Sequence, residues 1–297
     1  MRHRLEYSAV LCFLVIVRIL PRYATLRLGS VFGWLFYVLH RRRRQLALDN
    51  LQAAFPARTE RECRSILRGT FRHFGRHVVE LIKFDTMNAD EIMSFVEIEG
   101  EEHVQQALSS RTGVMYCGSH FGYWELHLKM HSFHYKPLVV VARTLDNPFL
   151  ERVIEQIRAR MGTQVVPRRG AVRGVLKALL KQESVVMMVD QHMQDRSAVI
   201  VDFFNRPAST TSALAVLAIR TGVPIIPVFA IPLAGGRYRM IYEAPIEPPA
   251  SDDPDPVLAY TQRCTDLLEK YVRLYPELWL WMHRRWRLPT PSSDSGA

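Results

Sequence analysis

The chain has 297 residues, 48% of them hydrophobic, so it can bury a sizeable core and is neither a disordered nor a fibrous sequence. Its 39 lysines and arginines outnumber its 29 acidic residues, and the net charge of +10 points to an anionic partner such as phospholipid, phosphorylated sugar, an acidic protein or nucleic acid. The four cysteines are scattered without a metal-ligand spacing, so we expect packed, reduced thiols, a cytoplasmic setting and no metal site.

Two short apolar runs lie near the N-terminus. The first, residues 9–17, is cut short by Arg18 and Pro21, and the second, residues 31–39, precedes four consecutive arginines at positions 41–44. Neither reaches the roughly 20 apolar residues of a spanning helix, although residues 7–20 suit a short or tilted span. Basic clusters beside apolar segments are attracted to anionic headgroups. We predict that residues 1–44 form a helical membrane-anchoring segment, with two buried core helices as the alternative.

From residue 59 to residue 84 the sequence predicts a helix, because Thr59 and Glu62 have capping-box spacing and apolar residues recur at helical spacing. Further along, apolar strands alternate with helical patterns. The expected strands are 114–117, 138–142, 165–166, 185–189, 200–204, 224–231 and 238–242, and the expected helices are 122–131, 147–161, 172–181, 211–221 and 255–273. This alternation predicts an α/β domain over residues 45–288 with a mixed, largely parallel sheet flanked by helices. The Pro/Ser-rich residues 289–297 are expected to be a disordered tail.

The stretch 114–126 carries the clearest chemical signal. It has the pattern of a buried strand, a turn between Gly118 and Gly122, and a helix start, with His120 in the turn and Glu125 after it. On one continuous helix these two side chains would point roughly 140° apart, so we expect His120 to lie off the helix that bears Glu125. The imidazole would then act as a general base held by the carboxylate, with helix-start amides available to an oxyanion. The alternative is a helix-capping His120 and a solvated Glu125.

Two rival nucleophiles adjoin this histidine. Ser119 is its chain neighbour, but Cys117 and Phe121 occupy the positions where a nucleophile elbow needs glycines. Cys117 ends an apolar strand, where a packed thiol is the usual finding. Both remain minor alternatives.

The stretch 118–126 closely resembles the His-x-x-x-x-Glu motif of the bacterial lipid A biosynthesis acyltransferases, the late lauroyl and myristoyl transferases of the lysophospholipid acyltransferase-like superfamily. Further similar segments follow in order over nearly the whole chain. They are 49–51, 55–56, Arg143 with 146–148, 158–162, 169–174, 190–191, 203–204, 207–208 and 281–286.

The resemblance implies an enzyme of lipopolysaccharide biosynthesis at the bacterial inner membrane, with a glycerolipid acyltransferase-like fold and its active site facing the cytoplasm. It would move a fatty acyl chain from acyl carrier protein, or acyl-CoA, to a hydroxyl of an anionic lipid A precursor by direct attack on the thioester, with no cofactor beyond this co-substrate. His120 would be the base, Glu125 would orient it, and Arg158 would steady the oxyanion. The resemblance assigns five further residues to substrate binding or support. They are Arg143, Arg169, Arg173, Asp190 and Gln191.

The remaining arginines and tryptophans also allow predictions. Candidates for phosphate or carrier contact are Arg168, Arg169, Arg173, Arg284, Arg285 and Arg287. Trp279, Trp281 and Trp286 suit core packing better than an interface. Two alternative functions stay open: acylation of another bacterial glycolipid or phospholipid, such as a phosphatidylinositol mannoside, and a noncatalytic basic protein that binds membranes or nucleic acid. The second leaves the His120–Glu125 pair unexplained, and no nucleic-acid-binding motif is evident, so we expect no nucleic acid partner.

Overall fold

The computed structural model describes residues 2–110, 112–142, 144, 146–168, 170–194, 198–250 and 252–287. The tail predicted over residues 289–297 lies outside them. The helices are α1 (Arg2–Ile19), α2 (Arg22–Leu39), α3 (Arg41–Ala54), α4 (Glu60–Thr86), α5 (Ala89–Met93), α6 (Glu101–Ser109), α7 (Trp124–His134), α8 (Pro148–Arg160), α9 (Ala171–Leu180), α10 (Ala213–Thr221) and α11 (Pro256–Leu274).

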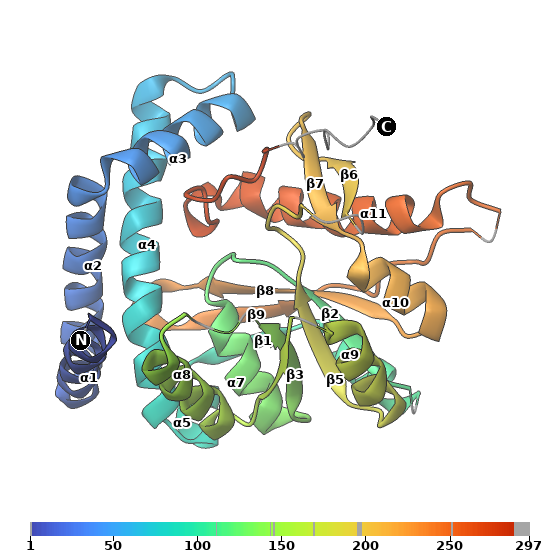
Figure 1. Cartoon of the computed structure of the whole chain (residues 1–297), viewed down its shortest axis with the longest axis horizontal. Helices are drawn as coiled ribbons and strands as arrows, with labels where there is room; N and C mark the ends of the chain where they lie inside the picture. Colours follow the sequence, from blue (N-terminus) through green and yellow to red (C-terminus); the bar gives the residue numbers. More distant parts are fainter. Residues whose placement is uncertain are drawn as a thin grey trace, which may run out of the picture.

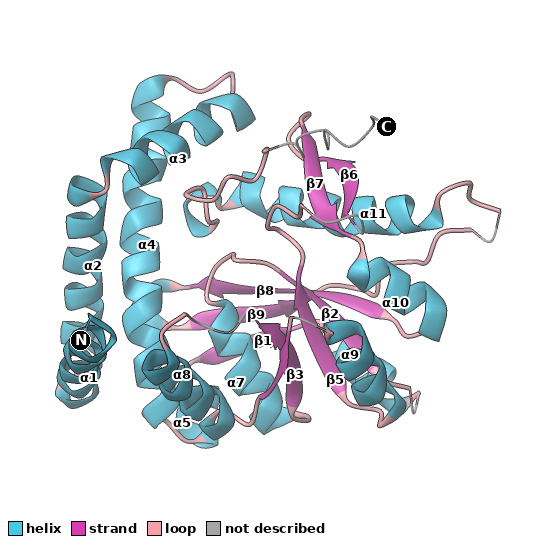
Figure 2. Cartoon of the chain, in the orientation of Figure 1, coloured by secondary structure: helices cyan, strands magenta, loops and turns pink. Residues whose placement is uncertain are grey.

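A seven-stranded sheet forms the centre of the molecule (Figures 1 and 2). Its strands are β1 (Val96–Glu99), β2 (Val114–Gly118), β3 (Leu138–Ala142), β4 (Gln164–Pro167), β5 (Ser184–Met188), β8 (Ile225–Pro232) and β9 (Tyr238–Tyr242), in the order β1-β9-β8-β2-β5-β3-β4. All pairings are parallel except that of β8 with β9. The predicted mixed, largely parallel sheet is therefore confirmed. Strand β1 escaped prediction because Glu97 and Glu99 interrupt its apolar pattern.

Helices cover both faces of this sheet, because successive side chains of a strand point to opposite faces. Tyr116, Val140 and Val186 pack on one face with residues of α4 to α8. Met115, Val139 and Val185 pack on the other face with residues of α9, α10 and α11. These two apolar layers hold the sheet in place and thereby fix the positions of the strand ends.

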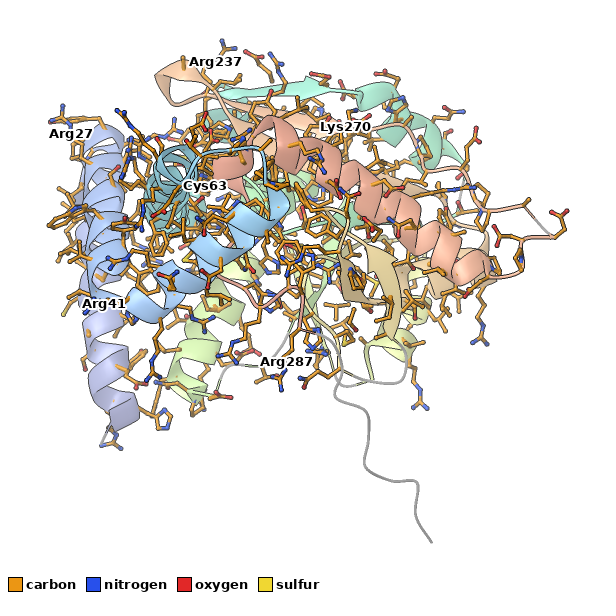
Figure 3. All side chains as sticks on the ribbon, turned by 90° about the horizontal axis from the view of Figure 1, so that it is seen from above. Arg27, Arg41, Cys63, Arg237, Lys270 and Arg287 are labelled. Atoms are coloured by element: carbon orange, nitrogen blue, oxygen red, sulfur yellow. The ribbon has the colours of Figure 1, made fainter. Side chains whose placement is uncertain are left out.

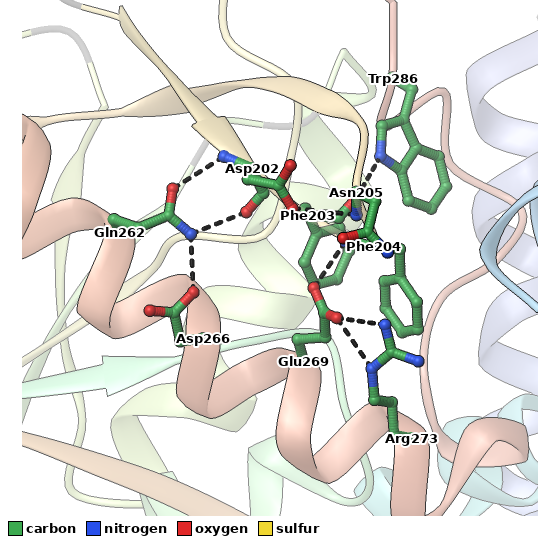
Figure 4. Close-up of polar contacts among 9 residues, drawn as sticks. All are labelled: Asp202, Phe203, Phe204, Asn205, Gln262, Asp266, Glu269, Arg273 and Trp286. Atoms are coloured by element: carbon green, nitrogen blue, oxygen red, sulfur yellow. Dashed lines mark hydrogen bonds and ion pairs between the residues drawn. The ribbon is translucent and has the colours of Figure 1, made fainter.

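The strand predicted over residues 200–204 exists as β6 (Ala198–Asp202), but it lies outside the main sheet. It pairs antiparallel with β7 (Pro207–Thr211) in a separate hairpin. Figure 4 shows how α11 holds the hairpin turn: Gln262 donates to the Asp202 carbonyl at 2.9 Å, and Glu269 accepts from the Phe204 amide at 2.5 Å. The indole of Trp286 donates to the Phe203 carbonyl at 2.9 Å, so the C-terminal segment is fixed to the same turn.

The predicted capping box is present at the start of α4, where Thr59 and Glu62 bond reciprocally. Helix α2 lies along α4 with very close backbone contact (Figure 1). A Cβ at Gly33 would overlap the Phe71 carbonyl oxygen, and a Cβ at Gly75 would overlap the Gly29 carbonyl oxygen, so this contact requires glycine.

The N-terminal helices α1 and α2 are only partly buried. Among the described residues, no helix combines the length and the apolar composition that crossing a membrane requires. One face packs on α4, while many large apolar side chains stay exposed. The most exposed are Val15, Ile16, Ile19, Tyr23, Val31, Trp34 and Leu39. Helix α3 then continues across residue 44, where the sequence suggested a boundary.

Candidate active site

Two neighbouring parallel strands end at the site. β2 and β5 are paired so that Gly118 lies opposite Met188, and the Val189 amide extends the ladder by donating to the Gly118 carbonyl at 3.1 Å. His120 and Asp190 each lie two residues beyond these paired ends. Because the carboxyl ends of parallel strands meet at one edge, two residues far apart in the chain become neighbours.

Asp190 holds His120 through two hydrogen bonds. Its Oδ1 accepts from the imidazole Nδ1 at 2.8 Å, and its Oδ2 accepts from the His120 backbone amide at 2.9 Å. The indole Nε1 of Trp279 donates to the same Oδ2 at 3.0 Å. On the far side of the ring, the amide nitrogen of Gln191 lies 3.3 Å from Nε2. An amide nitrogen only donates, so Nε2 is the accepting nitrogen and Nδ1 carries the proton.

Charge at this pair follows from its surroundings. Burial opposes protonation of the imidazole, but the charge and hydrogen bond of Asp190, with a contribution from Glu125, raise the pKa of His120 above its ordinary value. Burial would likewise neutralise Asp190, yet His120 and Trp279 keep the pKa of this carboxyl below its ordinary value. The carboxylate is therefore ionised and buried, with 1% of its side chain exposed.

The turn that presents His120 depends on Gly122. This residue has φ +59°, and a Cβ here would overlap the Ala230 carbonyl oxygen. Helix α7 begins at Trp124, which confirms that His120 lies off the helix that bears Glu125. The backbone amides of His120, Gly122 and Tyr123 donate to Asp190, Leu278 and Ala230, respectively. Contrary to the prediction, these three amides are therefore not available to an oxyanion.

Glu125 does not bond to the imidazole. Its Oε1 accepts from the Arg158 guanidinium at 3.3 Å, while its Oε2 is buried and has no partner among the residues that the structure describes. The orienting role expected for Glu125 is thus taken by Asp190, which the resemblance had placed only in substrate binding or support. Glu125 instead positions Arg158 beside the histidine and contributes its charge.

A cavity of about 640 Å³ opens in front of His120. Its polar rim includes Glu125, Arg158 and Gln191, and strands and α7 supply its apolar wall. The wall includes Leu128, Val140, Val186, Val228 and Ala230. A largely apolar cavity of this size with a few convergent polar groups is typical of a binding site for a small organic molecule.

Residues 1–288 match the family described as bacterial lipid A biosynthesis acyltransferase. This chain belongs to that family. It is 28% identical to a lipid A biosynthesis lauroyltransferase of Escherichia coli K12 over 90% of this chain and 87% of that protein. It is 29% identical to a lipid A biosynthesis acyltransferase of Haemophilus influenzae over 88% and 83% of the two chains. A phosphatidylinositol mannoside acyltransferase of Mycolicibacterium smegmatis is 24% identical over 74% and 72%. The protein is therefore an acyltransferase.

The remaining residues predicted for substrate binding are only partly at the cavity of this acyltransferase. Gln191 lines it, whereas Arg173 is exposed on α9 and is not among the described lining residues. Arg143 and Arg169 lie outside the described residues. Arg285, expected at a phosphate or carrier contact, is 1% exposed and donates to the Ser209 carbonyl and the Thr210 hydroxyl. It is a structural residue because burial removes it from any ligand.

The rival nucleophiles are poorly placed for acyl transfer. Cys117 is buried, and contact with Cys264 together with burial raises the pKa of its thiol well above the ordinary value, which disfavours the reactive thiolate. The Ser119 hydroxyl is buried and has no partner among the described residues. His120 thus remains the group best able to accept a proton at the cavity.

Several supporting residues gave no signal in the sequence. The three tryptophans pack in the core as expected, but Trp279 also bonds Asp190. His73, from α4, donates to the Gly122 carbonyl at 3.1 Å, and burial lowers its pKa to about 4, so it is neutral. His77 stacks on Trp124 with ring centroids 3.8 Å apart, and Trp124 meets the edge of His120. His73 and His77 are spaced on α4 like residues of an ordinary core face, so the sequence alone did not single them out.

Proposed function

We propose that this acyltransferase transfers a fatty acyl chain from an acyl carrier protein thioester to a hydroxyl of a lipid A precursor. The observation that carries the proposal is the arrangement around His120: its Nδ1–H donates to buried Asp190, its Nε2 is left with only the Gln191 amide as a partner, and the residue lines a largely apolar cavity. The names of the relatives and of the family indicate the acceptor class.

The reaction needs one base. Nε2 of His120 takes the proton of the acceptor hydroxyl as its oxygen attacks the thioester carbonyl carbon, and the hydroxyl displaces the Gln191 amide from Nε2. The carbon–sulfur bond then breaks, and the imidazolium returns the proton to the departing thiolate. Asp190 stays ionised and stabilises the imidazolium. No acyl-enzyme forms, and no cofactor beyond the thioester enters the scheme.

Arg158 supplies the positive charge that the attack requires. It lines the cavity beside His120 and is held by Glu125, which is 9% exposed. We place the developing oxyanion of the thioester carbonyl against this guanidinium, where a fixed charge in a water-poor site is most effective. The apolar wall between β2, β3, β5 and β8 takes the hydrocarbon tail of the acyl group.

We place the enzyme at the inner membrane with its active site toward the cytoplasm, as expected for the family, and the exposed apolar face of α1 and α2 supports the membrane contact itself. Scattered apolar residues are common on protein surfaces, but many exposed large apolar side chains on two successive helices are typical of an interfacial contact. Because no described helix is suited to crossing, we place these helices on the bilayer surface.

The phosphatidylinositol mannoside relatives favour one alternative acceptor, another glycolipid with a free hydroxyl. Both acceptors are tested together. The purified enzyme is given acyl carrier protein thioester and either lipid A precursor or phosphatidylinositol mannoside, and the products are weighed by mass spectrometry. We expect acyl transfer to the lipid A precursor, and a roughly 100- to 10,000-fold lower kcat in His120→Ala. Transfer to the mannoside alone would establish the alternative, and unchanged turnover in His120→Ala would remove the base assignment.

A further inference from the structure

A second cavity, of about 710 Å³, adjoins the first one. We call it the arginine cavity. Its lining consists of Arg42, Arg43, Leu46, Arg168, His192, Gln194, His283, Arg284 and Arg287. No carboxylate occurs among these described lining residues, so the concentrated positive charge is not neutralised from within the cavity. Arg168 and His192 also line the cavity of His120, so a ligand in one cavity can extend into the other.

The walls of the arginine cavity are fixed in place. Asn50 of α3 donates to the carbonyls of Trp281 and His283 at 2.9 and 3.0 Å, and the Arg43 guanidinium donates to the Met282 carbonyl at 3.0 Å. These bonds join α3 to the C-terminal segment, and Arg285 joins that segment to β7. The side of the cavity formed by α3 and the C-terminal segment is therefore held in place by the fold, which limits the ordering that ligand binding requires there.

Several polar groups of the cavity have no partner of their own. Arg42, Arg284 and Arg287 are exposed, and none is paired with a carboxylate among the described residues; Figure 3 shows Arg287 projecting outward at the end of the described chain. Both ring nitrogens of His192 and Nδ1 of His283 are buried and have no hydrogen-bond partner within the described part of the chain. Buried polar atoms are normally satisfied, so these point to a ligand that accepts hydrogen bonds.

The position of the cavity identifies the source of that ligand. The exposed apolar row of α2 continues through Trp34 and Val38 to Leu39, and α3 begins with the arginines two residues later. If the apolar row rests on the hydrocarbon, Arg42 and Arg43 lie at the depth of the headgroups. Guanidinium groups bind phosphate through paired hydrogen bonds, and several of them suit a doubly charged phosphomonoester.

We propose that the arginine cavity binds a phosphoryl group of the lipid acceptor and thereby places one acceptor hydroxyl against His120. The inference rests on the proposed function, since it concerns the acceptor of the same reaction. It also gives the arginine run a role at a defined site in addition to general attraction to the bilayer.

The test compares acceptors and variants in detergent micelles, where bilayer charge is absent. Arg42→Gln and Arg287→Gln remove cavity charges, and Arg68→Gln on the exposed side of α4 is the matched control. Each enzyme is assayed with the phosphorylated acceptor and with the same lipid after phosphatase treatment. We expect each cavity variant to raise KM for the phosphorylated acceptor about tenfold, equivalent to about 1.4 kcal/mol, with kcat and KM for the phosphatase-treated lipid unchanged.

Three results would overturn the inference while leaving acyl transfer intact. They are equal KM values for the two acceptors in the wild-type enzyme, an equal effect of Arg68→Gln, and a rise in KM for the acyl carrier protein donor instead of the lipid. The last result would assign the cavity to the carrier. Failure of the proposed function is different, because the wild-type enzyme would then acylate neither lipid.

Discussion

Asp190→Asn is the sharpest test of the site, because the change keeps the size of the side chain and alters one atom. The carboxylate accepts N–H groups at both oxygens: Oδ2 from the His120 amide and Trp279, and Oδ1 from the imidazole Nδ1. In the asparagine variant the amide oxygen must stay with the two donors at the Oδ2 position. The NH₂ group then faces Nδ1, which becomes the acceptor, and the proton moves to Nε2.

The predicted loss follows from that tautomer. With Nε2 protonated, the imidazole cannot accept the acceptor proton, so the general-base contribution of about 100- to 10,000-fold in kcat is lost. This corresponds to about 2.7 to 5.4 kcal/mol of transition-state stabilisation. The assay is steady-state acyl transfer by purified enzyme whose fold is checked by near-UV circular dichroism. Asp90→Asn, at an exposed position in the first turn of α5, is the matched control.

The pH dependence has a definite sign. Asp190 raises the pKa of His120, so in the wild-type enzyme kcat/KM should fall as pH drops through that raised value and the base becomes protonated. Without the negative charge of Asp190, only the smaller contribution of Glu125 opposes the effect of burial, so the pKa of His120 falls and the acid limb of the residual activity should move to lower pH. Wild-type kcat/KM in Asp190→Asn, or an acid limb that moves to higher pH, would refute this account.

Three further predictions concern residues around the site. Glu125→Gln and Arg158→Ala should each lower kcat about 100-fold, and the double variant should be no slower than the slower single variant, because one residue acts through the other; additive losses would contradict this coupling. Asn50→Ala should lower the free energy of unfolding by about 1 to 3 kcal/mol in urea titrations, because two main-chain carbonyls lose their buried donor; an unchanged value would show that the bonds are dispensable. Ile19→Asp with Trp34→Asp should abolish sedimentation with anionic vesicles while the melting temperature stays unchanged, and continued sedimentation would contradict surface binding by this face.

The sequence predicted the elements whose signals are local. The capping box at Thr59, the apolar strand predicted over residues 114–117 and the turn around His120 all depend on neighbouring residues, and all three are confirmed. Alternation of strands and helices likewise fixed the class of the sheet. Strand β7 was not predicted, because its sequence, which contains Ser209 and Thr210, is polar and resembles a loop.

The partner of His120 is not a local property. Asp190 lies 70 residues further along, and β3 and β4 intervene in the chain although β5 is the spatial neighbour of β2. Glu125, five residues away in the same motif, is the candidate that local spacing offers. The pairing of β2 with β5 instead brings Asp190 to the imidazole, and Glu125 bonds Arg158. Arginine burial is similarly non-local: Arg284 and Arg285 are adjacent, yet one faces a cavity and the other lies in the core.

The N-terminal helices are bonded to the rest of the fold by partly buried polar contacts, besides forming the proposed membrane contact. Arg22 of α2 donates to Glu80, to the Gly236 carbonyl and to Tyr238, which joins α2 to α4 and to the β8–β9 turn. Arg18 of α1 and Arg160 of α8 both bond Asp85 at 2.7 Å, and Arg160 is two residues from Arg158. Deleting residues 1–44 would therefore leave Glu80 buried without its cation and Asp85 with one of its two, which is costly. Loss of activity in such a truncation would report misfolding as readily as detachment, so substitutions confined to the exposed apolar face separate the two.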